Sequence, residues 1–224
     1  MIIAIDGTAS SGKSTIAKTL ANSLSIPILN TGAIYRAITL KMINFNVDYN
    51  NIALVKQTLN STIINTYECN NQLLIEVDSF TQDPKQLNSP EVSALTPKFA
   101  CLEFVRDFVR NIQRTQALNY KNIIVEGRDI GSVVFPNAEA KFFIDADLQT
   151  RATRRLQDYI KQGKQKTLDE VVFDLKTRDD EDKYRHHSPL IMTHDSILLD
   201  TSNLTIEESV NKMITKLKEK GLQI

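Results

Sequence analysis

The sequence predicts an α/β fold of three layers, in which helices flank a central parallel sheet. Short apolar runs bounded by polar or glycine residues are typical of strands that are buried on both faces. Stretches with helical periodicity lie between these runs, so strands and helices alternate along the chain. The length of 224 residues fits one such domain better than two. We therefore expect a single domain over residues 1–224.

The candidate elements follow one another in the order that a crossover sheet requires. The apolar runs lie at residues 2–5, 28–29, 123–125, 142–144 and 197–199. A helix is predicted over residues 13–24, because Ile16, Leu20 and Leu24 recur on one face, and another over residues 206–217. Such helices would connect parallel strands.

The middle of the chain departs from this pattern. Leu73, Ile75 and Val77 stand at alternate positions after two turn-forming asparagines, which predicts a β insertion within residues 62–90. A loop is predicted between residues 84 and 90. It is followed by a helical stretch over residues 92–118 with interruptions around Pro97. The insertion is too short to form a second full domain.

The charge composition excludes a strongly basic or acidic protein. Lysine plus arginine number 27 and aspartate plus glutamate number 27, so the formal net charge is zero. A chain without net charge has no overall field that attracts nucleic acid or a membrane surface. We therefore expect neither as a partner, a monomeric state, and any anion site to be local.

The cysteine content and the start of the chain indicate a cytoplasmic protein. Cys69 and Cys101 are too few for a disulfide framework or a four-cysteine zinc site, so we expect a reducing compartment and two buried thiols. Met1 leads into an apolar stretch without the basic start or cleavage site of an export signal. No apolar segment has the length that a membrane-spanning helix needs.

One short segment carries the strongest chemical signal. It satisfies the pattern of glycine, four residues, glycine, lysine and serine or threonine through Gly7, Thr8, Ala9, Ser10, Ser11, Gly12, Lys13 and Ser14. A strand is predicted before it and a helix after it, the context in which backbone N–H groups surround phosphate. Lys13 would contact the β- and γ-phosphates of a nucleoside triphosphate, and the Ser14 hydroxyl would hold Mg²⁺.

The phosphate loop does not by itself choose between a GTPase switch, an ATPase and a small-molecule kinase. A guanine-reading Asn-Lys-x-Asp segment is absent, since Asn211 and Lys212 are followed by Met213 and Ile214. Three other segments, 31–36, 126–131 and 178–185, are rich in anion-binding side chains. Their arginines predict a second phosphate near the carboxyl edge of the sheet. Each arginine taken alone is more typical of a solvated surface charge or a simple ion pair.

The sequence resembles the bacterial-type cytidylate kinases, a branch of the nucleoside monophosphate kinases with a phosphate loop. The resemblance covers nearly the whole chain. It rests on residues 7–15, 31–36, 105–106, 126–136, 154–155 and 178–182, followed by Arg185 and Pro189. It implies the phosphate-loop fold, a β insertion in the monophosphate-binding region, and a lid over about residues 150–186. It also implies transfer of the γ-phosphate of ATP, with Mg²⁺, to CMP or dCMP.

The resemblance assigns roles to particular residues. Catalysis would involve Lys13, Arg128, Arg154 and Arg178. ATP would be bound by the loop residues 7–14 with Thr15 and by Arg154 of the lid. The monophosphate would be bound by Thr31, Tyr35, Arg36, Arg106, Arg128, Asp129, Arg178, Asp182 and Arg185. Of these, Arg106, Asp129 and Arg185 would face cytosine and Asp182 the ribose.

The chain departs from the family pattern at three positions. Relatives usually carry proline at the position of Thr8, arginine at that of Asn88 and a base-contacting serine near Pro97. The first change leaves the glycines and Lys13 in place. The other two affect the predicted base site, where Thr96 would offer a replacement hydroxyl.

Two other functions stay open from the residues alone. An ATP-dependent switch would use the loop but needs no acceptor site. A kinase for a non-nucleotide metabolite such as shikimate would leave Arg106, Asp129, Asp182 and Arg185 without a joint purpose. His186, His187 and His194 lack metal-ligand spacing, so we expect them at the surface.

Overall fold

The computed structural model describes residues 1–222, and its strands in that range form one sheet. The strands are β1 Ile2–Gly7, β2 Ile28–Asn30, β3 Ile64–Cys69, β4 Gln72–Val77, β5 Phe80–Thr81, β6 Ile123–Glu126, β7 Ala140–Asp145 and β8 Ile197–Asp200. Their order is β3-β4-β2-β6-β1-β7-β8, with β5 paired to β4. Every pair is parallel except β3 with β4 and β4 with β5.

Helices connect and cover these strands. They are α1 Lys13–Leu24, α2 Thr31–Asn44, α3 Ile52–Asn60, α4 Pro84–Leu87, α5 Pro90–Ala100, α6 Glu103–Leu118, α7 Leu148–Lys161, α8 Leu168–Tyr184 and α9 Ile206–Glu219. A single π-helical turn, Ile130–Val134, follows β6. Capping boxes at Thr167 and Thr205 begin α8 and α9, since each threonine and the glutamate three residues later bond to each other's backbone N–H.

The sheet separates two apolar cores, which confirms the predicted three-layer α/β fold. On one face, Ile16 and Leu20 of α1 and Met213 of α9 pack against Ile3 and Phe142. On the other face, α2, α3, α5 and α6 pack against the opposite side of the same strands. Strands with apolar side chains on both faces are what a buried parallel sheet requires.

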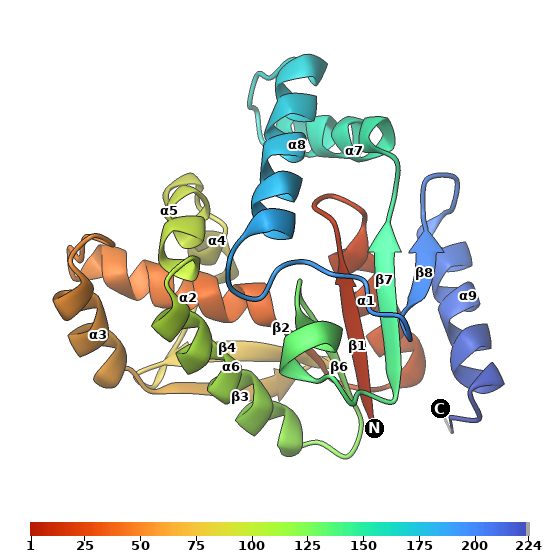
Figure 1. Cartoon of the computed structure of the whole chain (residues 1–224), viewed down its shortest axis with the longest axis horizontal. Coiled ribbons are helices and arrows are strands. Elements are labelled where there is room, and N and C mark those ends of the chain that lie inside the picture. Colours follow the sequence, from red (N-terminus) through yellow and green to blue (C-terminus); the bar gives the residue numbers. More distant parts are fainter. Residues whose placement is uncertain (223–224) are drawn as a thin grey trace.

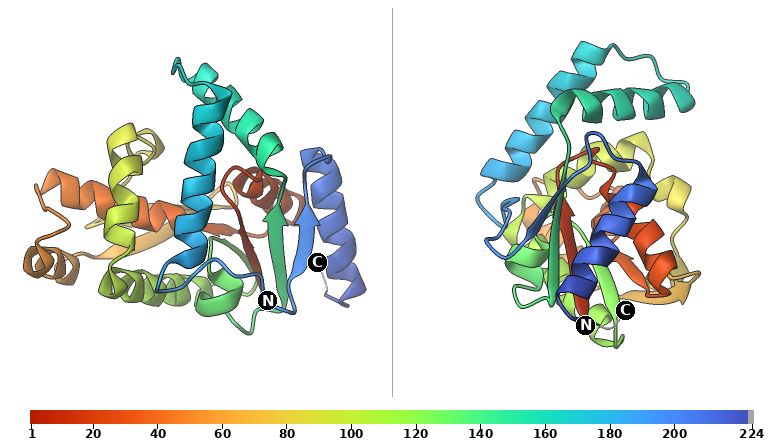
Figure 2. Two further views of the ribbon diagram at one scale, coloured as in Figure 1. Left: turned by 45° about the horizontal axis from the view of Figure 1, so that its top comes forward. Right: turned by 90° about the vertical axis from the view of Figure 1, so that its right-hand side faces the viewer.

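The carboxyl edge of the sheet is the end at which its parallel strands terminate. These strands end at Gly7, Asn30, Glu126, Asp145 and Asp200, so polar groups gather at one edge. The helices α7 and α8, which we call the lid helices, project beyond that edge (Figure 1). The two views of Figure 2 show the same projection from other sides.

The predicted β insertion is present and extends the main sheet. β3 and β4 form an antiparallel hairpin, and Gln72 of β4 pairs in parallel with Ile28 of β2. The predicted loop at residues 84–90 contains the short helix α4, which is capped by Asp83. The helical stretch after it breaks at residues 101–102, whereas Pro97 lies inside α5. The expected break at Pro97 is therefore wrong by about one turn.

One expectation about the thiols is also wrong. Both Cys69 and Cys101 are exposed. Cys69 ends the hairpin strand β3 beside a turn, and Cys101 follows the last residue of α5, so neither lies on a core-facing position. Within residues 1–222, no helix combines the length and the apolar character that crossing a membrane demands.

Candidate active site

The phosphate loop occupies residues 8–12, between β1 and α1. Gly7 has φ +151°, and a Cβ there would lie 2.0 Å from the carbonyl oxygen of Ile144, so the backbone requires glycine. Gly12 caps α1 with φ +84°, and within residues 1–222 no side-chain hydrogen bond caps this helix start. The free N–H groups at this helix start are suited to an anion.

Three side chains meet at the start of α1. Lys13 forms a buried ion pair with Glu126 at the end of β6, and Ser14 Oγ donates to the same Glu126 Oε1 at 2.9 Å. The other carboxylate oxygen, Oε2, is buried and lacks a hydrogen-bond partner among residues 1–222. An unpartnered buried oxygen of this kind is suited to a cation or its bound water.

Burial and mutual attraction together set the pKa values of Lys13 and Glu126. Burial lowers the pKa of Lys13 to about 8, although Glu126 acts against that shift. Burial would raise the pKa of Glu126, but Lys13 and Arg128 overcome it and hold the pKa below its usual value. Both groups are therefore charged near neutral pH, and Glu126 neutralises Lys13 in this structure.

Sequence reasoning gave Glu126 no role of its own. The available signal was its position, an acidic residue at the carboxyl end of the buried strand beside the strand that bears the phosphate loop. Its contact with Lys13 joins residues that are 113 positions apart in the sequence, so no local pattern predicts the contact.

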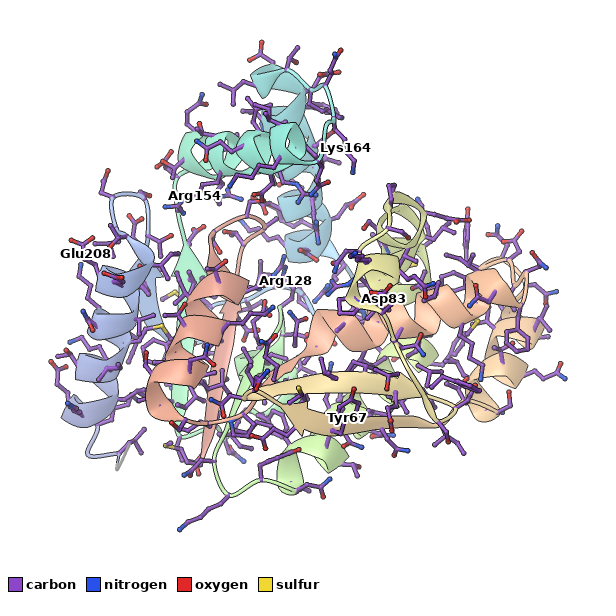
Figure 3. The ribbon with its side chains drawn as sticks, turned by 180° about the vertical axis from the view of Figure 1, so that it is seen from behind. Tyr67, Asp83, Arg128, Arg154, Lys164 and Glu208 are labelled. Atoms are coloured by element: carbon purple, nitrogen blue, oxygen red, sulfur yellow. The ribbon has the colours of Figure 1, made fainter. Side chains whose placement is uncertain are left out.

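A cavity of about 820 Å³ opens from this group toward α8. Its walls come from α1, α2, α5, α6, β6 and α8. Of the residues predicted for the site, it is lined by Lys13, Ser14, Thr31, Tyr35, Arg36, Arg106, Arg128, Asp129, Arg178, Asp182 and Arg185. Figure 3 shows Arg128 in the central space and Arg154 at the base of α7.

Three arginines crowd the middle of the cavity. Burial lowers the pKa of Arg36 and of Arg178, and Arg128 lowers both further, with Glu126 opposing the shift of Arg36. Arg178 is exposed, and it lines the cavity. Among residues 1–222, neither Arg36 nor Arg178 has an ion-pair partner, and Arg36 Nε is buried without a hydrogen bond. Three positive charges that face one cavity are suited to binding an anion.

Two carboxylates hold the arginines at the far end. Asp182 accepts from Arg128 Nε and from Arg185 Nη1, each at 3.1 Å. Asp129 lies 3.8 Å from Arg106 Nη1, and Arg106 lies over the Tyr35 ring at 5.7 Å from its centroid. This end therefore offers both donors and acceptors, as recognition of a polar ring requires.

The remaining predicted residues have mainly structural contacts. The Thr31 hydroxyl donates to the Glu126 carbonyl at 2.8 Å. Arg154 donates to the Thr201 carbonyl at 2.6 Å and approaches the Ser11 carbonyl at 3.5 Å. Thr8 Oγ1 donates to Asp145 at 2.6 Å, which gives the unusual threonine a partner. Thr31 lines the cavity, whereas Arg154, residues 7–12 and Thr15 do not.

The departures at α4 and α5 line the cavity. Asn88 donates its amide to the Pro84 carbonyl at 2.7 Å, and the Thr96 hydroxyl donates to the Val92 carbonyl at 2.7 Å. Each side chain keeps an oxygen that can accept from a ligand. Pro97 and Lys98 stand beside them in the wall.

The three histidines form no metal site in the described chain. His186 and His194 are exposed, and His187 is half-buried with Nδ1 at 3.4 Å from Glu103. Within residues 1–222 no cluster of histidine, cysteine, aspartate and glutamate is arranged to hold a metal ion.

Asp6, at the end of β1, ties the two halves of the site together. Its carboxylate accepts from the N–H groups of Ile130 at 2.8 Å and Gly131 at 2.7 Å. Burial raises its pKa to about 6, with the two N–H bonds acting against the shift. The segment that carries Arg128 and Asp129 is thus anchored to the strand that carries the phosphate loop.

Asp6 should make folding stability depend on pH. The folded carboxyl keeps its proton up to a pKa of about 6, against 3.8 when unfolded, so stability falls as pH rises between these values. Two pKa units correspond to about 3 kcal/mol. We expect the unfolding free energy of the wild type, minus that of Asp6→Asn, to fall by up to this amount from pH 4 to pH 7.

Urea unfolding at several pH values measures this difference. Asp195→Asn is a control in which the pH dependence of the stability difference should have the opposite sign, because a hydrogen bond from Lys141 lowers the pKa of Asp195 to about 2. Its stabilising effect should therefore be lost as pH falls. A flat difference for Asp6 would contradict a raised pKa.

Comparison with known proteins agrees with this geometry. The family model described as Cytidylate kinase matches residues 3–219. A Cytidylate kinase of Fusobacterium nucleatum is 39% identical over 98% of each sequence, and one of Thermotoga maritima is 39% identical over 97% of each. A solved shikimate kinase of Bacteroides thetaiotaomicron superimposes with a TM-score of 0.51 at 14% identity, over 97% of this chain and 98% of that one. That likeness shows a shared fold alone.

Proposed function

This chain belongs to the cytidylate kinase family, and we propose from this that it transfers the γ-phosphate of ATP to CMP or dCMP. The products would be ADP and CDP or dCDP. The single observation that carries the proposal is the cavity that joins Lys13 and Ser14 to the cluster of Arg36, Arg128 and Arg178. A donor phosphate site and an acceptor phosphate site thus share one space.

In the proposed donor site, the triphosphate lies on the loop of residues 7–15. The free N–H groups at the start of α1 bind its oxygens, and Lys13 turns from Glu126 toward the β- and γ-phosphates. Arg154, held beside the Ser11 carbonyl, adds positive charge next to the loop.

The residues present fit a magnesium ion. Ser14 Oγ and Glu126 Oε2, which has no hydrogen-bond partner among residues 1–222, are hard oxygen atoms near the start of α1. They are the type of ligand that this ion prefers, directly or through water. When bound with ATP, the ion would supply positive charge to the phosphate oxygens. Ser14 and Glu126 are the groups that would hold it.

In the proposed acceptor site, Arg36, Arg128 and Arg178 hold the monophosphate in line with the γ-phosphate, with Thr31 beside them. The acceptor phosphate is already ionised near neutral pH, so one of its oxygens attacks the γ-phosphorus without a general base. A bond forms between these atoms, and the bond from the γ-phosphorus to the bridging oxygen breaks. The arginines act by position and charge.

At the base end, Asp129 would accept from the exocyclic amine of cytosine, while Arg106 and Arg185 would donate to its ring nitrogen and carbonyl. Asp182 would contact the ribose, and Tyr35, whose ring lies against Arg106, would line the same end of the site. A base with a carbonyl in place of the amine would leave the Asp129 carboxylate without a donor. UMP should therefore be the poorer acceptor.

An acceptor panel tests the proposal. We expect ADP release from ATP to rise strongly with CMP or dCMP and much less with UMP, AMP, GMP or shikimate, in the presence of Mg²⁺. ATP consumption that ignores every acceptor would instead indicate a nucleotide-controlled switch. We further propose a cytoplasmic monomer without a nucleic-acid partner. The zero net charge supports the last point, because such a chain has no overall field that attracts nucleic acid. Gel filtration with light scattering tests the monomer.

A further inference from the structure

One residue of the phosphate loop is built into the base of the lid helices. Ala9 is 2% exposed, and its methyl group belongs to an apolar cluster with Ala152 of α7 and with Val171 and Leu175 of α8. The loop is therefore in contact with the lid through a small core of its own, separate from the two cores of the sheet.

A buried ion pair holds both backbone groups of this same residue. Arg151 Nη1 of α7 donates to the Ala9 carbonyl at 3.1 Å, and the Ala9 N–H donates to Asp179 Oδ1 of α8 at 3.4 Å. Arg151 and Asp179 bond to each other at 2.5 Å, with side chains 8% and 20% exposed. Arg151 Nε also donates to the Ala146 carbonyl at 2.9 Å. One peptide of the donor loop is thus clamped by two lid helices.

The clamp also fixes the helix that carries an acceptor residue. Asp179 directly follows Arg178 on α8, so the two side chains leave the helix about 100° apart. Asp179 contacts the loop, and Arg178 lines the acceptor cavity. One turn further along, Asp182 bonds to Arg128. The helix α8 therefore connects the donor loop to the acceptor arginines as one rigid element.

We propose that Arg151 and Asp179 are positioning residues for phosphoryl transfer, which set the distance between the donor loop and Arg178. This rests on the proposed function. Neither side chain lines the cavity, so each acts through Ala9 and α8 and not by touching a substrate. Arg151→Met leaves the Asp179 carboxylate without this partner, and Asp179→Asn leaves Arg151 with only its longer 3.9 Å contact to Asp145 Oδ1, so each single variant should move the loop.

The test uses the full chain with Arg151→Met, Asp179→Asn and the double variant. We expect each single change to lower kcat on the order of 10²-fold, the effect of misplacing reacting groups by about 1 Å, with little change in the KM for CMP. The double variant should be no slower than the slower single one, because the two residues act as a unit. Amide exchange of Ala9 should be faster in all three.

Two further variants separate positioning from folding. Arg151→Lys keeps the charge but lacks the planar group that donates to the Ala9 and Ala146 carbonyls at the same time. Its kcat should therefore lie between those of the wild type and Arg151→Met, with a nearly unchanged melting temperature. Asp174→Asn, on the same helix, removes the exposed pair with Lys166 and should keep the wild-type kcat.

The failures are distinguishable. A wild-type enzyme that transfers no phosphate to any nucleotide would overturn the proposed function. Transfer by the wild type with unchanged kcat and Ala9 exchange in the folded variants would overturn only the positioning role. A kcat that falls as much in Asp174→Asn as in the Arg151 and Asp179 variants would also overturn the positioning role.

Discussion

Lys13→Met is expected to lower kcat by about 10³-fold, the upper part of the range for removing one donor to a transition-state oxygen. In the proposed reaction Lys13 is the side chain nearest the transferring group on the donor side, and methionine fills its volume without charge. The rate of ADP release with saturating ATP and CMP measures the effect.

This variant also leaves Glu126 buried without its partner. Breaking a buried pair in this way costs about 3–5 kcal/mol of stability, so a loss of activity alone would be ambiguous. The double variant Lys13→Met/Glu126→Gln removes both charges and should recover most of the unfolding free energy but not kcat. Recovery of turnover together with stability would show that Lys13 has no part in the reaction.

Arg178→Met is expected to lower kcat/KM for CMP by about 10²-fold, because one of three charges that hold the acceptor phosphate is lost. Its effect on stability should have the opposite sign. Arg128 and Arg36 repel Arg178 in this structure, so its removal relieves repulsion and should leave the melting temperature equal or higher. Assays across CMP concentrations and thermal unfolding measure the two effects.

Inorganic phosphate supplies an independent readout of the same cluster. A ligand that binds only the folded state raises the melting temperature, and the gain depends on its dissociation constant. Phosphate should therefore stabilise the wild type more than Arg178→Met. Lys176→Met, an exposed change on the same helix, should respond like the wild type. Equal stabilisation of all three proteins would show that phosphate binds at a site that does not include Arg178.

The sequence was sufficient where the signal is local. The phosphate loop has a fixed spacing, and helix α1 begins and ends at the predicted residues. The alternation in residues 62–80 likewise gave the β3–β4 hairpin. Proline was a weaker guide, since Pro97 lies within α5 and the chain turns only after Ala100. Helix α5 continues through Pro97, although proline has no backbone N–H to donate.

The parts that the sequence did not reveal depend on contacts between distant segments. Glu126 meets Lys13, and Arg151 meets Ala9, only because β6 and β7 lie on either side of β1. The exposure of Cys69 and Cys101 follows from positions at a hairpin turn and a helix end. Family resemblance named the arginines of the acceptor site, whereas the geometry shows which of them lack a partner in the described chain.

The sheet order also bears on synthesis of the chain. β1 carries the phosphate loop and is made first, yet its neighbours β6 and β7 end at Glu126 and Asp145. A nascent chain that stops short of these strands has the loop sequence without the sheet that shapes it. ATP therefore cannot stabilise the first half of the protein as it leaves the ribosome. Nucleotide binding begins to favour folding only after more than half of the chain has emerged.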